Sequence, residues 1–159
     1  MPAILLTITC TTAPATDLGF LLHKNPANVR SVALSFGTAR VFHPEALPER
    51  CTAALLLEID PVSLARRGRS SPFPLAEYVN DRPYVASSFL SVAIAKVYGT
   101  AMAGRSADRP ELVDAPLSLE ARLPVVPARG GPDLVGRLFE PLGCRADAEP
   151  IALDERFPE

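Results

Sequence analysis

The chain has 159 residues, of which 48% are hydrophobic and 21% are charged, and this composition excludes an intrinsically disordered protein. Sixteen basic and 18 acidic residues give a net charge of −2, which excludes a protein that binds nucleic acid over its whole surface. No apolar run approaches the roughly 18 residues of a membrane-spanning helix, and the N-terminus lacks the basic start of a signal peptide. We expect one cytoplasmic domain spanning residues 1–159.

Alternating apolar residues predict that the first part of the chain is mostly β-strand. The predicted strands are residues 4–10, 29–36, 39–43 and 52–60. A short helix between the first two strands should be capped by Thr16 or Asp17 and extend to Lys24. Gly37-Thr38 lies between the second and third strands and predicts a hairpin turn.

A loop rich in arginine, serine and proline follows at residues 66–74. Its arginines, Arg66, Arg67 and Arg69, are candidates for weak contacts with RNA phosphates. The other interpretation is a loop whose charges face water, which is the usual role of a charge cluster.

The longest predicted helix spans residues 83–102, with Asp81 as its cap and Pro83 in its first turn. Apolar residues cover most of its circumference, which is typical of a buried helix. One row of small residues is spaced four apart along it, namely Ser87, Ser91, Ala95 and Gly99. Such a row permits close approach of another element, either from within the domain or from a partner protein.

The last part of the chain predicts two strands separated by a helix. Residues 117–125 alternate cleanly and should place Leu117, Leu119, Ala121, Leu123 and Val125 inward, and residues 144–153 should form a final strand. Gly130-Gly131 leads into the helix between them, and Gly143 should cap its end. The order of elements predicts an α+β fold, a mainly antiparallel sheet with helices packed on it. Two sub-modules joined by residues 66–80 are the alternative organisation.

The sequence contains no recognisable catalytic or metal site. Cys10, Cys51 and Cys144 are far apart and are best explained as reduced, buried thiols. His23 and His43 have no metal-ligand spacing. Two adjacent glycines are too few for a nucleotide-binding turn, and there is no P-loop. We expect no catalytic residue, no metal and no cofactor in this chain.

Polar and ionic residues are concentrated where the long helix begins, at Asn80, Asp81, Arg82 and Tyr84. One interpretation is a capped helix start. The other is a recognition corner in which the planar guanidinium of Arg82 contacts a partner.

Several runs of the sequence, together spanning nearly the whole chain, resemble the N-terminal domain of bacterial HEN-type 3′-terminal RNA ribose 2′-O-methyltransferases. These runs are residues 13–24, 50–57, 80–95, 108–112 and 156–159. The sequence differs from the family pattern at Phe20, Arg40 and His43.

The resemblance implies a role in bacterial RNA repair. In this family the C-terminal half is a manganese-dependent methyltransferase that uses S-adenosylmethionine, whereas the N-terminal half binds a polynucleotide kinase-phosphatase-ligase and is needed for its ligase step. We therefore expect a separate, non-catalytic N-terminal domain in a hetero-oligomer that activates the ligase on damaged RNA. The alternative is an RNA-binding domain that presents 3′ ends to the methyltransferase half. The candidate partner-binding residues are Asn80, Asp81, Arg82, Tyr84, Ser87, Ser91 and Arg109.

Overall fold

The computed structural model describes residues 3–61, 83–126, 130, 131 and 133–151, and for residues 83–87 it describes the backbone alone. The predicted loop at residues 66–74 lies outside the described residues. The chain forms two compact units, Met1–Val125 and Val126–Glu159. The boundary between them falls after the fifth strand, not in the region between residues 66 and 80.

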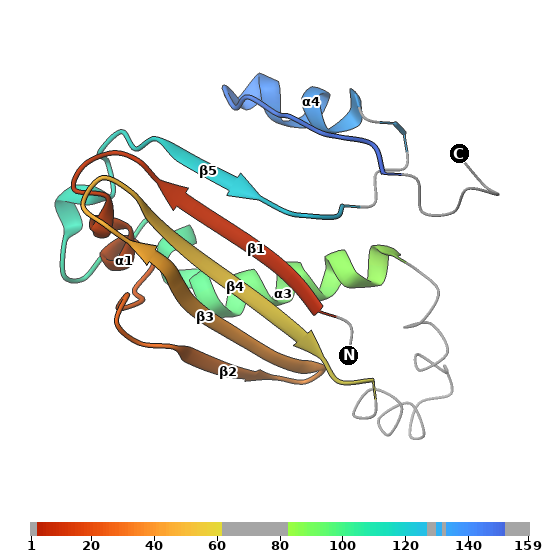
Figure 1. Ribbon diagram of the computed structural model, residues 1–159, viewed down its shortest axis with the longest axis horizontal. Coiled ribbons are helices and arrows are strands. Elements are labelled where there is room, and N and C mark those ends of the chain that lie inside the picture. The colour runs from red at the N-terminus through yellow and green to blue at the C-terminus, as the bar shows by residue number, and fades with distance from the viewer. Residues whose placement is uncertain (1–2, 62–82, 127–129, 132, 152–159) are drawn as a thin grey trace. The chain divides into compact units, whose positions relative to one another are not determined.

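The first unit is built on a five-stranded antiparallel sheet with the strand order β2-β3-β4-β1-β5 (Figure 1). Its strands are β1 (Ala3–Cys10), β2 (Arg30–Leu34), β3 (Gly37–Ala46), β4 (Cys51–Ile59) and β5 (Leu119–Arg122). Short links between successive strands bring β2, β3 and β4 together as neighbours. The predicted α+β class and the predicted strands β1 to β4 are confirmed, although the β2–β3 turn precedes Gly37 instead of following it.

Helix α3 (Pro83–Met102) covers one face of this sheet and completes the core (Figure 1). In β1 to β4 the alternate residues that face α3 are the apolar ones, as the period of two in the sequence predicts. From the sheet, the fully buried side chains of the core include Cys10, Val41, Cys51, Leu55 and Leu57. From α3, the core receives Leu90, Ala93, Val97 and Tyr98.

The prediction that α3 is buried nearly all round is wrong, because the helix covers a sheet on one side only. The side chain of Val92 is 51% exposed and that of Met102 is 68% exposed. Ser91 and Ala95 of the small-residue row are exposed as well, and a Cβ added to Gly99 would meet no atom within 4 Å. Within the described residues, this row therefore makes no close contact.

Two predictions about the later strands are also wrong. Strand β5 contains only four residues, all exposed, because it pairs with β1 alone at the edge of the sheet. Leu119 is 55% exposed and Val125 is 63% exposed, although the alternation predicted both inside. Residues 144–151 do not form a strand.

The second unit contains helix α4 (Asp133–Phe139), followed by the 3-10 turn η3 (Glu140–Leu142). Gly143 ends this segment with a φ of +80°, the left-handed conformation expected of a glycine cap. The thiols of Cys10 and Cys51 are buried and free as predicted, whereas Cys144 is free and exposed. No helix among the described residues has the length and apolar character needed to cross a membrane.

Strand β3 contains an irregularity at His43-Pro44, where its pairing with β4 shifts register between Phe42 and Glu45. Proline has no N–H to donate to the sheet and is tolerated at such a bulge. His43 is half-buried, and neither ring nitrogen has a hydrogen-bond partner among the described residues. Burial lowers the pKa of His43, because the charged imidazolium loses its hydration.

The first prediction concerns the core helix. Replacing Leu90, which is 8% exposed, with aspartate should reduce the free energy of unfolding by about 3 kcal/mol or more, since an unpaired carboxylate would enter the core. The matched control is Val92→Asp on the exposed side of the same helix, which should cost less than about 1 kcal/mol. Chemical denaturation followed by circular dichroism measures both. Equal losses in the two variants would show that this face of α3 is not core.

The second prediction concerns pH. Because the pKa of His43 is lower in the folded than in the unfolded chain, the unfolded chain binds more protons as the pH falls below about 6.5. His43 therefore leaves stability unchanged above about pH 7.5 and reduces it as the pH falls through 6.5 toward the folded pKa. The His43→Gln variant should lose less stability than the wild type between pH 7.5 and 5.5. Parallel stability curves for the two proteins would contradict this.

Candidate protein-binding surface

Most of the candidate binding residues proposed from the sequence have no described side chain. Asn80, Asp81 and Arg82 lie outside the described residues, as do the loop arginines Arg66, Arg67 and Arg69. Tyr84 and Ser87 belong to the first two turns of α3, where only the backbone is described. Ser91 is exposed, and its hydroxyl donates a hydrogen bond of 2.8 Å to the carbonyl of Ser88.

Arg109 lies beyond the opposite end of α3 from Tyr84. At 1.5 Å per residue, this 20-residue helix is roughly 30 Å long. Tyr84 and Arg109 therefore do not form one compact site, and Arg109 has different neighbours.

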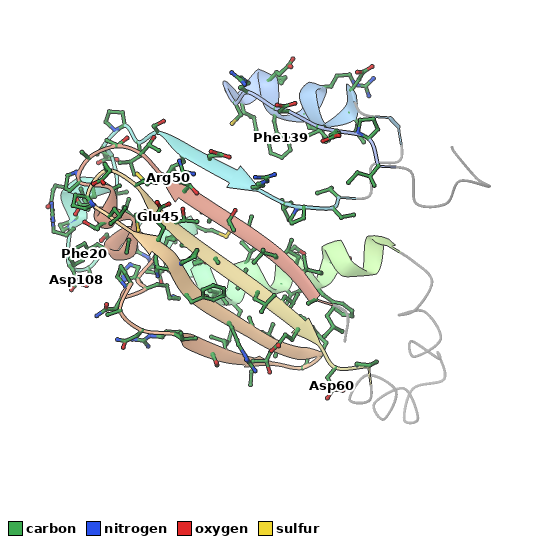
Figure 2. All side chains as sticks on the ribbon, viewed as in Figure 1. Phe20, Glu45, Arg50, Asp60, Asp108 and Phe139 are labelled. Carbon is green, nitrogen blue, oxygen red and sulfur yellow. The ribbon has the colours of Figure 1, made fainter. Side chains whose placement is uncertain are left out.

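Arg109 belongs instead to a cluster at the end of the sheet near η1 (Ala15–Asp17) and α1 (Leu18–Leu21). We call this cluster the α1 corner, and its members are Asp17, Phe20, His23, Ser106, Arg109 and Glu111. Figure 2 shows Phe20 and Asp108 at this end of the sheet, along with Glu45 and Arg50, whereas Asp60 marks the opposite end. The corner joins two segments of the chain, residues 15–24 and 105–112.

The guanidinium of Arg109 is the centre of the α1 corner. Its Nη1 lies 3.4 Å from Oδ1 of Asp17, and its Nε donates a hydrogen bond to the carboxylate of Glu111. Its central carbon is 5.7 Å from the centroid of the Phe20 ring, within the range of a cation–π contact. The hydrogen bond from Arg109 lowers the pKa of Glu111. A cation, an aromatic ring and two carboxylates are thus held together.

Polar contacts to the backbone fix the two segments of the corner against each other. Nε2 of His23 donates a hydrogen bond of 2.9 Å to the carbonyl of Arg105. The hydroxyl of Ser106 lies 3.4 Å from the carbonyl of Phe20 and accepts a hydrogen bond of the same length from the amide of Arg109. His23 has a φ of +53°, a conformation uncommon for a residue with a side chain. These contacts hold the backbone beneath Phe20 and Arg109.

Lys24 links the α1 corner to the core helix. Its ammonium donates a hydrogen bond of 2.9 Å to the carbonyl of Val97 in α3, and two longer ones to the carbonyls of Leu22 and His23. It also lies 5.8 Å from the ring centroid of Tyr98. Burial, followed by the nearby charge of Arg30, lowers the pKa of Lys24. Lys24 thereby links the segment after α1 to α3, the helix that packs on the sheet.

Glycine at position 19 allows the chain that follows α1 to pass close to the helix. A Cβ on Gly19 would lie 2.9 Å from Cδ of Pro26 and 3.0 Å from the carbonyl oxygen of Lys24, too close for any side chain. The amide of Ala15 donates a hydrogen bond of 2.7 Å to the carbonyl of Pro48, so η1 is also fixed to the β3–β4 turn. Helix α1 ends at Leu21, short of the predicted Lys24. Asp17 occupies its N-cap position, as predicted, but the Asp17 side chain makes no capping hydrogen bond and pairs with Arg109 instead.

The exposed part of this corner has the chemistry of a protein-binding surface. Phe20 is 42% exposed, and the side chain of Arg109 is 39% exposed, while that of Asp17 is only 12% exposed. Arginine and aromatic side chains contribute most of the binding energy in many protein interfaces. Among the described residues, no group of three or more His, Cys, Asp or Glu side chains is placed to hold a metal ion.

The sequence indicated Arg109 as a binding residue but did not indicate its partners Asp17, Phe20 and Glu111. The available signal was the resemblance itself, because residues 13–24 and 108–112 were two of its matching runs. The structure shows that these two runs meet in space.

Comparison with known proteins agrees with that resemblance. The model of one protein family, described as the RNA repair, ligase-Pnkp-associating region of Hen1, matches residues 4–159. No curated protein shows significant similarity to the chain. The family match covers both units of the structure, including the α1 corner. The chain therefore belongs to the family of ligase-Pnkp-associating regions of Hen1, which functions in RNA repair.

Proposed function

We propose that this domain activates the RNA ligase of its polynucleotide kinase-phosphatase-ligase partner by docking through the α1 corner, and contributes no catalytic group. The family description supports association with a ligase-containing partner. The observation that carries the choice of surface is the Arg109 guanidinium, held between Asp17 and Glu111 beside the exposed ring of Phe20.

The α1 corner suits binding because its shape is fixed before the partner arrives. Ser106, His23 and Lys24 hold the backbone on both sides of Phe20 and Arg109. Binding then costs little conformational entropy, which leaves more of the contact energy as affinity. Asp17, nearly buried, orients the guanidinium and leaves its exposed edge available to a carboxylate or carbonyl of the partner.

Activation in this proposal is a shift of population in the ligase. If the α1 corner binds the active conformation of the ligase more tightly than inactive conformations, docking raises the fraction that is active. The domain itself needs no cofactor for this role. Manganese and S-adenosylmethionine belong, in the proposal, to the methyltransferase half of full-length members of the family, and RNA is held within the hetero-oligomeric complex.

The third prediction tests the α1 corner. Phe20→Ala and Arg109→Ala should each weaken binding to the purified partner by about tenfold or more, and ligation at subsaturating domain should fall in parallel. The matched control is Arg40→Ala, which removes another half-exposed arginine of the first unit, one that pairs with Glu58 at 3.1 Å. Calorimetric titration and end-joining assays measure these effects, and circular dichroism checks the fold of each variant.

Two outcomes would contradict the proposed function. A wild-type domain that leaves ligase adenylylation and end joining unchanged at saturating concentration would exclude activation. Tight, salt-dependent binding of labelled RNA without any binding of the ligase partner would favour presentation of RNA 3′ ends instead.

A further inference from the structure

The second unit exposes the apolar side of its helix. Along α4 and η3, Leu138 is 59% exposed, Phe139 is 48% exposed and Leu142 is 74% exposed. We call these three residues the α4 apolar face. No described residue of α4 or η3 is buried.

Only part of the apolar surface of the helix is covered within the second unit. Leu134 and Val135 of α4 are half-buried. The charged residues that line a shallow pocket between α4 and residues 146–148, namely Asp133, Arg137 and Glu140, are exposed. In a self-sufficient fold the rest of the apolar side would be covered as well, but Leu138, Phe139 and Leu142 remain exposed.

The size of the second unit accounts for this arrangement. It comprises only Val126–Glu159, and chains below about 40 residues rarely bury enough surface to fold without a disulfide, a metal or a partner. Its one cysteine, Cys144, is free, and no cluster of metal ligands occurs among its described residues. An additional apolar surface is therefore needed to cover Leu138, Phe139 and Leu142.

We propose that the α4 apolar face docks into an apolar groove on the polynucleotide kinase-phosphatase-ligase, as a second contact in addition to that of the α1 corner. This inference rests on the proposed function. The ligase-associating family match extends across residues 126–159, so the second unit belongs to the region that meets the partner. Leu138 and Phe139 at the end of α4 and Leu142 in η3 present three large apolar side chains from one short helical segment, as the anchors of a helix that binds in a groove do.

The charges of the second unit suit such an interface. Asp133, Arg137 and Glu140 lie on the pocket side, so they would form a polar rim around a groove that receives the leucines and the phenylalanine. Because both units belong to one chain, docking of the α1 corner raises the local concentration of the α4 apolar face near the partner. Two modest contacts then combine into tight association.

Cys144 provides a direct readout in the unmodified protein. It is exposed and follows Leu142 by two residues, whereas Cys10 and Cys51 are buried in the first unit and act as internal controls. Burial also raises the pKa of the Cys51 thiol, which lowers its reactivity further. Binding of the partner should slow alkylation of Cys144 by N-ethylmaleimide at least tenfold, as followed by peptide mass spectrometry.

The matching variant is Leu138→Ser combined with Leu142→Ser. It should bind the partner about tenfold or more weakly than the wild type and should leave Cys144 reactive at partner concentrations that saturate the wild type. The control is Asp147→Ser on the pocket side, which should behave as the wild type does. Circular dichroism and thermal unfolding should show the first unit unchanged in both variants.

Each contrary result has a distinct meaning. Protection of Cys144 in the free chain would overturn the inference: protection that rises with concentration would identify a second copy as the occupant, and protection independent of concentration would identify the chain itself. Equal partner binding by wild type and the double serine variant, with Cys144 still reactive, would overturn this inference and leave the α1 corner standing. Absence of binding by the wild type would overturn the proposed function as well.

Discussion

The packing of α3 on one face of the sheet is the constraint on which the first unit depends. Strand β4 lies between β3 and β1, and its inward residues Cys51, Ala53, Leu55, Leu57 and Ile59 are buried under the helix. Among the described residues, α3 is the long helix over the sheet, and its apolar side chains close most of the core, with a smaller share from Leu18 and Leu22. The same helix must also turn an exposed side to water. This exposed side still carries apolar residues, among them Val92 and Met102.

The α1 corner depends on where α3 ends. Lys24 contacts the Val97 carbonyl in α3 and, together with the glycine turn at Gly19, fixes the chain after α1. The chain that leaves α3 then passes this turn and brings Arg109 to Asp17 and Phe20. A surface assembled in this way has charged and aromatic groups in fixed positions, which is what recognition of another protein requires.

The two units bury their apolar side chains to different extents. The first unit buries its apolar side chains in its own core, and its candidate surface is polar, aromatic and rigid. The second unit is too small to do so, and its apolar residues remain exposed on α4 and η3. In our proposal, one chain thus carries a preformed contact surface and a second segment that is covered when it docks on the partner. In a region that associates with a ligase, these two features can act together, because the covalent link makes the second contact intramolecular once the first has formed.

The sequence by itself determined the elements whose pattern is local. Alternation located β1 and β4, the bounds of α3 were predicted at Pro83 and Met102, and long runs of residues identified the family. The tertiary structure decided which patterned residues have a neighbour to pack against. The alternation of β5 predicted burial, but an edge strand has one neighbour and remains exposed. The pairing of Asp17 with Arg109, 92 residues apart, also depended on the topology. A local pattern predicts which residues one segment can bury, whereas contacts between distant segments exist only after the chain has folded.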